Sequence, residues 1–196
     1  MSSPTALHAL DDDPIDRDRA EAAVADLLAA LGHDVAREHL SETPRRVVDG
    51  LLELTTPEPF TMTTFENDTG YDDLVVVRGI RFTSLCAHHL LPFRGEADIA
   101  YLPGDRLVGL SKLARVVDRF ARGLQVQEGL TTQIADELDA VLAPRGVGVV
   151  LRAEHLCMSI RGVRAPESIT ETTAFRGALA DDVVLRSRIL DDGRRS

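Results

Sequence analysis

The stretch LVVVRGIRFTSLCAHHLLPFRGEADIAYL, residues 74–102, places two apolar segments on either side of a cysteine-histidine motif. The first segment, Leu74 to Phe82, is rich in β-branched residues and predicts a strand that leads into the motif. The second, Phe93 to Leu102, alternates apolar and polar residues as a half-buried strand does, and Pro103-Gly104-Asp105 predicts a turn after it. These residues therefore predict two strands of one sheet.

The pattern after this stretch changes to helices and then returns to strands. Helices are predicted over 111–123, with Ser111 as N-cap, and over 126–144. Further strands are predicted over 147–158 and 169–175. The order of two strands, two helices and two strands predicts an α+β fold, in which an antiparallel four-stranded sheet carries two helices on one face.

The residues before this fold predict a separate helical part. Residues 1–13 are acidic and are expected to form a disordered leader. Asp13 and Pro14 predict the N-cap and first residue of a helix, and a second helix is expected from Thr43. We therefore expect an N-terminal helical extension over 14–60 and the main domain over 61–196.

The composition excludes several classes of protein. The net charge of −10 over 196 residues argues against a general nucleic-acid binder, whose surface would be basic. No apolar run approaches the ~18 residues of a membrane span, and the N-terminus has no secretion signal. The sequence therefore predicts a cytoplasmic protein that binds neither nucleic acid nor membrane.

Both cysteines of the chain lie close to histidines. Cys86-Ala87-His88-His89 and His155-Leu156-Cys157 together hold both cysteines and three of the six histidines. Two cysteines can also form one disulfide, but this spacing to histidine favours thiolates that bind a metal. Cys86, His89 and Cys157 would supply three ligands to Zn²⁺ and leave a fourth position open, as catalytic zinc does.

Two histidines of these segments would then remain beside the metal. Because side chains alternate along a strand, His155 and Cys157 are expected to face the same side of the sheet. Adjacent His88 and His89 must point apart unless a turn intervenes. His88 and His155 are therefore candidates for proton transfer.

A second candidate site lies at the start of the helix predicted from Ser111. Its first-turn amides would attract an anion, and Lys112 and Arg115 share one face beside them. Lys112 is the one lysine among 22 basic residues. The same pattern equally fits a solvated basic face that continues through Arg119 and Arg122. Arg46, Arg161 and Glu128 have no local feature that separates them from ordinary surface residues.

Four motifs in order resemble the GTP cyclohydrolase I family. They are Cys86 to Phe93 (CAHHLLPF), Gly109 to Arg115 (GLSKLAR), Gln125 to Glu128 (QVQE), and His155-Leu156-Cys157 with Arg161-Gly162-Val163. The resemblance, from about residue 40 to the end, implies a tunnelling-fold catalytic domain over 61–196. It also implies a homodecamer of two pentameric rings with active sites between subunits.

The resemblance also implies an activity and residue roles. The chain would convert GTP and water to formate and 7,8-dihydroneopterin triphosphate, the first step toward folate or related pterins. Zinc would be held by Cys86, His89 and Cys157, with His88, His155 and Ser111 catalytic. The implied substrate contacts are Glu128 and Gln127 for the guanine and Lys112, Arg115, Arg161 and Arg46 for the triphosphate.

Two positions depart from the family pattern. Ala87 stands where the family usually has glutamate, and Gly123-Leu124 where arginine and proline are common. These departures leave two alternatives open. One is a paralogue with a different product or substrate scope, and the other is a ring scaffold that binds a purine without turnover.

Overall fold

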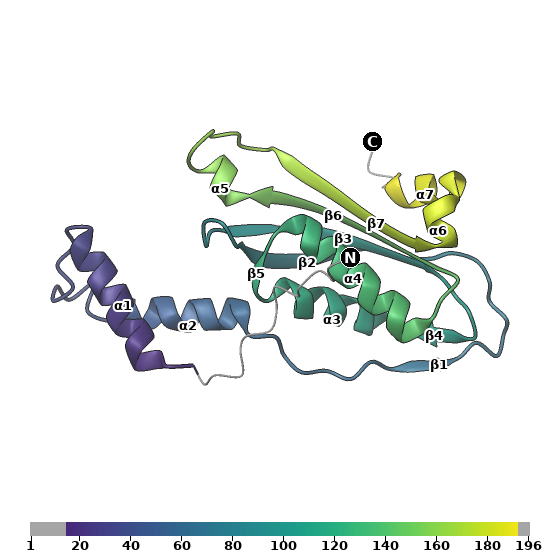
Figure 1. Ribbon diagram of the computed structural model, residues 1–196, viewed down its shortest axis with the longest axis horizontal. Coiled ribbons are helices and arrows are strands. Elements are labelled where there is room, and N and C mark those ends of the chain that lie inside the picture. The colour runs from purple at the N-terminus through teal and green to yellow at the C-terminus, as the bar shows by residue number, and fades with distance from the viewer. Residues whose placement is uncertain (1–14, 192–196) are drawn as a thin grey trace, which may run out of the picture. The chain divides into compact units, whose positions relative to one another are not determined.

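The computed structural model describes residues 15–191 and divides into two compact units, one up to Thr56 and the other from Pro57 (Figure 1). The expected leader over 1–13, with Asp13 as N-cap and Pro14 as first helical residue, lies outside the described residues. None of the helices in the described part is long and apolar enough to cross a membrane.

The first unit is a pair of helices, α1 (Arg17–Ala30) and α2 (Thr43–Thr55), that pack against each other. Helix α1 begins at Arg17, later than the sequence predicted, because Asp16 caps it by accepting a hydrogen bond from the Arg19 amide at 3.0 Å. An ion pair between Arg17 and Asp49 joins the two helices. Of the described residues of these helices, only Val48 is buried, so this unit has almost no core of its own.

The second unit contains the two-layer fold. Its elements in chain order are β1 (Thr64–Glu66), β2 (Val75–Cys86), β3 (Pro92–Leu102), β4 (Arg106–Val108), α3 (Leu110–Ala121), β5 (Leu124–Gln125), α4 (Gln127–Leu142), β6 (Gly146–His155), α5 (Leu156–Ser159), β7 (Ile169–Gly177), α6 (Ala178–Asp181) and α7 (Val183–Leu190). The main sheet has the order β5-β2-β3-β6-β7. Its four long strands are antiparallel, as predicted.

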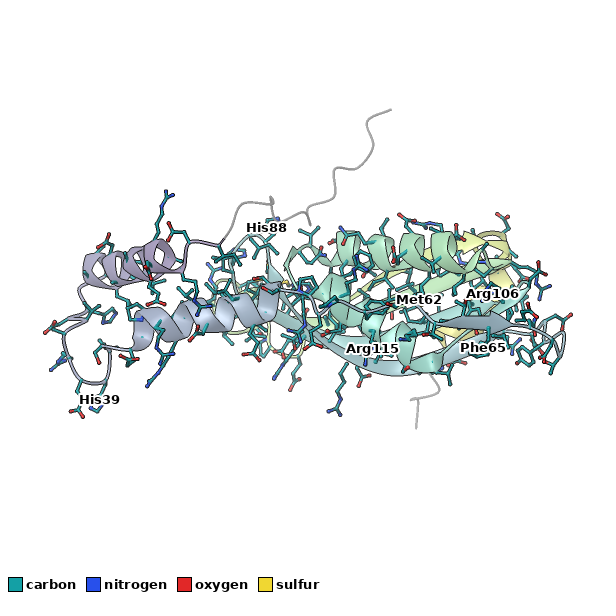
Figure 2. All side chains as sticks on the ribbon, turned by 90° about the horizontal axis from the view of Figure 1, so that it is seen from below. His39, Met62, Phe65, His88, Arg106 and Arg115 are labelled. Atoms are coloured by element: carbon teal, nitrogen blue, oxygen red, sulfur yellow. The ribbon has the colours of Figure 1, made fainter. Side chains whose placement is uncertain are left out.

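The second unit differs from the prediction by an additional edge strand and by a separate two-stranded ribbon. Strand β5 adds a fifth strand that runs parallel to β2, so the sheet is mixed rather than wholly antiparallel. Strands β1 and β4 form a separate two-stranded ribbon, in which Phe65 and Arg106 lie close together (Figure 2). Neither β1 nor β5 exceeds three residues, which is too short for a pattern of alternation to mark.

Helices α3 and α4 cover one face of the sheet and make the main core, as predicted. Leu113, Val116 and Val117 of α3 are fully buried there, together with Leu130, Ile134 and Leu138 of α4 and with alternate residues of β3 and β6. The helical spacing of these residues places them on one stripe of each helix, which is why both helices lie flat on the sheet. Val141, near the end of α4, is 42% exposed.

The opposite face is covered at one end by α6 and α7, which pack Leu179 and Ile189 on the sheet (Figure 1). Asp98 of β3, 1% exposed, anchors this end by accepting hydrogen bonds from Arg78, Arg152 and the Gly79 amide. Gly79 has φ +70° at a β-bulge that turns its amide toward Asp98. The two arginines also donate to the last carbonyls of α7.

Candidate metal and proton-transfer site

A tight turn after β2 brings the side chains of Cys86, His88 and His89 close together. Cys86 ends the strand, and its carbonyl accepts from the amides of His89 at 3.2 Å and Leu90 at 2.9 Å. Leu90 adopts φ +55°, which reverses the chain into β3. Because this turn intervenes, the two histidines do not point apart as neighbours in a strand would. The Nδ1 atoms of His88 and His89 each lie 3.8 Å from Cys86 Sγ.

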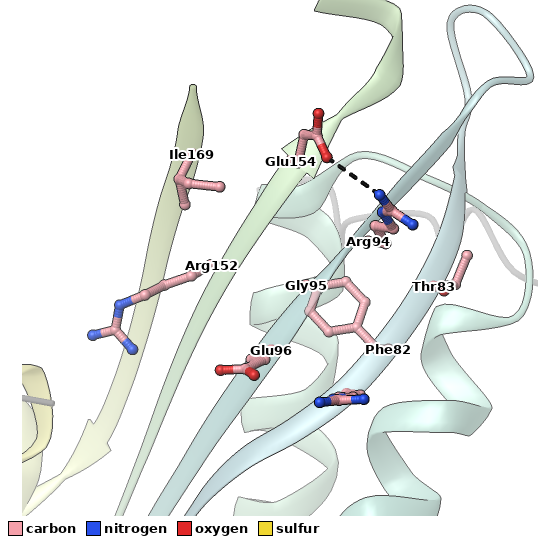
Figure 3. A pocket seen from close by; sticks show the side chains of 9 residues that line it. Phe82, Thr83, Arg94, Gly95, Glu96, Arg152, Glu154 and Ile169 are labelled. Carbon is pink, nitrogen blue, oxygen red and sulfur yellow. Dashed lines mark ion pairs between the residues drawn. The ribbon is translucent and has the colours of Figure 1, made fainter. Parts of the chain in front are cut away.

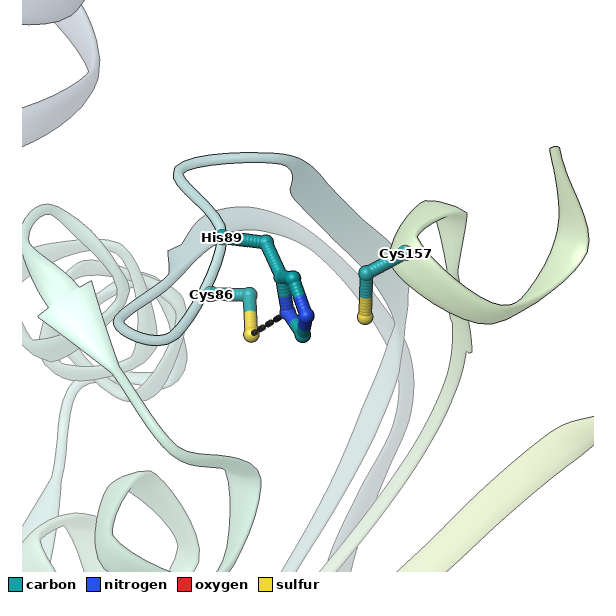
Figure 4. Close-up of side chains that lie close together, drawn as sticks. All are labelled: Cys86, His89 and Cys157. Carbon is teal, nitrogen blue, oxygen red and sulfur yellow. Dashed lines mark hydrogen bonds between the residues drawn. The ribbon is translucent and has the colours of Figure 1, made fainter. Parts of the chain in front are cut away.

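Cys157 completes the cluster from a different element than predicted. Strand β6 ends at His155, and Cys157 lies on the short helix α5, so the expectation that both residues occupy one strand is wrong. The cluster forms nonetheless, because α5 turns the thiol back toward the β2–β3 turn (Figure 4). The ligand atoms of Cys86, His89 and Cys157 all lie within 4.8 Å of one another.

The chemistry of these donors fits a metal ion. Both cysteines are free thiols. Burial, followed by the neighbouring thiol of Cys86, raises the pKa of Cys157 above the ordinary thiol value. A thiolate at either of these neighbouring cysteines is therefore unfavourable unless a cation neutralises its charge. Two thiolates and an imidazole are donors that select zinc and similar soft or borderline metals.

His155 is held beside this cluster by contacts on its ring face and on its edge. Phe93, its partner across the β3–β6 ladder, stacks on the imidazole with ring centroids 4.7 Å apart and an interplanar angle of 0°. Nε2 of His155 lies 2.7 Å from Oε1 of Gln127. Burial lowers the pKa of His155, and the carboxylate of Glu128 opposes that shift. The structure thus brings His155 and Gln127 into contact and places Glu128 close enough to act on His155.

Gln127 itself is 1% exposed at the first residue of α4. Its Nε2 has three acceptors, which are the Leu151 carbonyl at 3.2 Å, the Thr170 carbonyl at 3.0 Å and Thr172 Oγ1 at 3.1 Å. Sequence reasoning found neither these partners nor the stacking of Phe93, because they come from β6, β7 and β3. The only local signals of the site in the sequence were the motif from Cys86 to Phe93 and the QVQE motif.

The predicted phosphate-binding residues are divided between elements. Helix α3 begins at Leu110 with Gly109 as N-cap, so Ser111 is not the N-cap but an exposed residue of the first turn. Lys112 is half-buried in the same turn, and Arg115 is exposed one turn further (Figure 2). Within residues 15–191, no hydrogen bond or ion pair joins these three side chains to the cysteine cluster.

The remaining two arginines differ in their relation to the cluster. Arg161 follows α5 and donates to the Cys157 carbonyl at 3.4 Å, so it lies beside the cluster. Arg46 lies on α2, in the first unit, and is exposed.

A separate hollow of about 550 Å³ lies on the sheet, lined by residues that include Arg81, Arg94, Glu96, Arg152 and Glu154 (Figure 3). Arg94 follows Phe93, and Glu154 precedes His155. Because side chains alternate along a strand, Arg94 and Glu154 point to the face of the sheet opposite to Phe93 and His155. The loose ion pair between them spans 3.7 Å. None of the residues proposed for the metal or the substrate lines this hollow.

Comparison with known proteins gives matches over most of the chain. The sequence profile described as GTP cyclohydrolase I matches residues 20–193. The chain is 50% identical over 182 residues to GTP cyclohydrolase 1 of Brucella suis, covering 90% of this chain and 84% of that protein. It is 53% identical over 163 residues to GTP cyclohydrolase 1 of Brucella canis, covering 81% of this chain and 76% of that protein.

Among solved structures, the apo form of the archaeosine synthase QueF-Like is similar with a TM-score of 0.44 at 20% identity, over 53% of this chain and 93% of that one. This likeness carries no argument about function. The profile match extends over both units and includes every residue from Arg46 to Arg161 discussed above. The chain belongs to the GTP cyclohydrolase I family.

Proposed function

We propose that this protein is a zinc-dependent GTP cyclohydrolase I, which opens the imidazole ring of GTP at carbon 8 and releases formate and 7,8-dihydroneopterin triphosphate. The observation that carries the proposal is the meeting of Cys86, His89 and Cys157 beside His155 in a member of this family. The product would enter folate or related pterin biosynthesis in the cytoplasm.

Cys86, His89 and Cys157 would hold the zinc ion. When bound there, zinc supplies Lewis acidity that brings the pKa of a coordinated water to about 7. The two thiols and the imidazole come from a strand end, a turn and a short helix, all fixed by the sheet. The fold therefore brings the three donors to one place.

His88 and His155 are proposed to move protons during ring opening. A ring nitrogen of the purine must gain a proton as its bond to carbon 8 breaks, and a histidine near neutral pKa serves this purpose. Burial lowers the pKa of His155, which keeps its imidazole neutral and able to accept a proton at pH 7. Ser111 is proposed to take part at the ribose end of the substrate.

Glu128 is proposed to bind the guanine edge, because its carboxylate is exposed in the first turn of α4 and close enough to act on His155. Lys112, Arg115, Arg161 and Arg46 are proposed to bind the triphosphate. In a homodecamer of two pentameric tunnelling-fold rings, a neighbouring subunit would bring its α3 residues to the site. Such an arrangement accounts for the lack of a hydrogen bond or ion pair between the Ser111, Lys112 and Arg115 side chains and the cysteine cluster within residues 15–191 of one chain.

The test is incubation of the purified, zinc-loaded protein with GTP, followed by mass analysis of the product and measurement of formate. We expect one formate per 7,8-dihydroneopterin triphosphate and one zinc per chain. A formamide product would instead identify a paralogue with an incomplete reaction, which Ala87 would help to explain. Binding of GTP without formate would identify a scaffold and contradict the proposal.

A further inference from the structure

We propose that Gln127 is a positioning residue that holds a hydrogen on Nε2 of His155, so that Nδ1 is the atom with which His155 exchanges a proton. This inference rests on the proposed function and gives Gln127 a different role from the guanine contact suggested by the motif. It follows from the directions of the hydrogen bonds around one buried amide.

Two backbone carbonyls decide which way the amide of Gln127 faces. Its Nε2 lies 3.2 Å from the Leu151 carbonyl and 3.0 Å from the Thr170 carbonyl. Carbonyl oxygens only accept hydrogen bonds, so the group that faces them must be the NH₂ and not the oxygen. A flipped amide would place an oxygen against two oxygens in a buried site, where unmade hydrogen bonds are expensive.

A chain of threonine hydroxyls is consistent with the same orientation. Thr131 Oγ1 donates to the Gln127 carbonyl at 2.7 Å, which uses its single proton. Thr172 must then donate across the 2.6 Å contact between the two hydroxyls. This leaves a lone pair of Thr172 to accept from Gln127 Nε2 at 3.1 Å. The two hydroxyl protons of the network thus each have one acceptor.

The orientation of the amide determines the tautomer of His155. Oε1 of Gln127 can only accept, and it lies 2.7 Å from Nε2 of His155. That nitrogen must therefore carry a hydrogen, and the lone pair of the neutral ring is on Nδ1. The stacked ring of Phe93 restrains rotation of the imidazole out of this hydrogen bond.

The same contacts and its burial keep the Gln127 side chain away from a substrate. Its NH₂ has two hydrogens and three acceptors, its oxygen accepts from His155, and the residue is only 1% exposed. Recognition of guanine would then depend on Glu128 without help from the Gln127 side chain. The two adjacent residues of α4 therefore have separate roles, one inside the protein and one at its surface.

The direct test is magic-angle-spinning NMR of the zinc-loaded protein labelled with ¹⁵N-histidine, recorded at about pH 8, above the ordinary histidine pKa of about 6.5. The His155 signals are identified by their loss in His155→Ala. We expect the hydrogen on Nε2 of His155 in the unmodified protein. A hydrogen on Nδ1 would overturn the proposal, whether or not the protein turns over GTP.

The second test compares Gln127→Met with Gln133→Met, a matched change on the same helix. Gln133 accepts a hydrogen bond from Gln125 at 2.9 Å, and within residues 15–191 no hydrogen bond joins it to His155. Loss of correct proton transfer predicts that Gln127→Met lowers kcat by about tenfold or more, while KM for GTP and zinc content are retained.

Gln133→Met should keep the kcat of the unmodified protein. A raised KM with unchanged kcat in Gln127→Met would show a substrate contact and overturn the proposal. An equal fall of kcat in both variants would show general destabilisation and would also overturn it. Absence of any product from the unmodified protein would contradict the proposed function, while the NMR result would still decide the tautomer.

Discussion

The raised pKa of Cys157 predicts how metal binding depends on pH. Burial and the neighbouring thiol of Cys86 hold the proton on Cys157 in the metal-free protein, so between pH 7 and 8 that thiol is protonated. A cysteine binds metal as thiolate, so binding must release this proton. The affinity for zinc should therefore rise with pH, since fewer protons compete with the ion.

The contribution of this single thiol can be isolated with Cys157→Ser. One released proton makes the association constant change about tenfold per pH unit, or about 1.4 kcal/mol. Serine keeps its proton in this range and contributes no such dependence. Every other group at the site is shared by the two proteins, so the difference between them reports Cys157 alone.

The assay is titration with zinc in weak buffer containing a pH indicator, at several pH values from 7 to 8. We expect the unmodified protein to release about one more proton per bound zinc than Cys157→Ser does, and its log affinity to rise more steeply with pH by about one. Equal proton release from both proteins would refute the reasoning, because Cys157 would then be either no ligand or already a thiolate.

Three further predictions concern the site and the sheet. His89→Ala should lose zinc, whereas His88→Ala should keep zinc in metal analysis and lose about 10²-fold or more in kcat. Lys112→Ala should raise KM for GTP by about tenfold or more in steady-state kinetics, because a charge-assisted hydrogen bond is worth about 1.5–3 kcal/mol; an unchanged KM would leave it a surface residue. Asp98→Asn should lower the free energy of unfolding in urea by about 3 kcal/mol, because it removes the buried partner of two arginines. Asp136→Asn, which breaks an exposed pair with Arg176, should cost less than about 1 kcal/mol.

The long elements were predictable because their patterns are local. The β-branched run before Cys86 and the alternation after Phe93 are β2 and β3, and helical spacing marked α3 and α4. One predicted cap was wrong for a local reason. Gly109 precedes Ser111 by two residues, and which of them caps α3 depends on where the chain enters the helix.

The short elements were not predictable, because distant residues determine them. Leu156-Cys157-Met158 suits a strand as well as a helix, and no side chain caps α5, so the sequence has no signal for the end of β6 at His155. Strand β5 exists only because Leu124 and Gln125 pair with Leu85 and Cys86. That pairing also supports the cysteine turn, since the Ala87 amide donates to the Gln125 carbonyl at 2.9 Å.

The order of the strands explains why residues so far apart in the chain can share one ion. Strands β2 and β6 both run antiparallel to β3, one on each side, so the end of each lies at the start of β3. Cys86 ends β2, and Cys157 follows β6 by two residues. Neighbouring strands are about 4.8 Å apart, which leaves roughly 10 Å between the two strand ends. The turn through His89 and the helix α5 close this gap to the 4.8 Å of the donor cluster. A sheet in which β6 lay on the far side of β7 would separate the thiols by a further strand, so a shared ion requires β2 and β6 to lie no more than one strand apart.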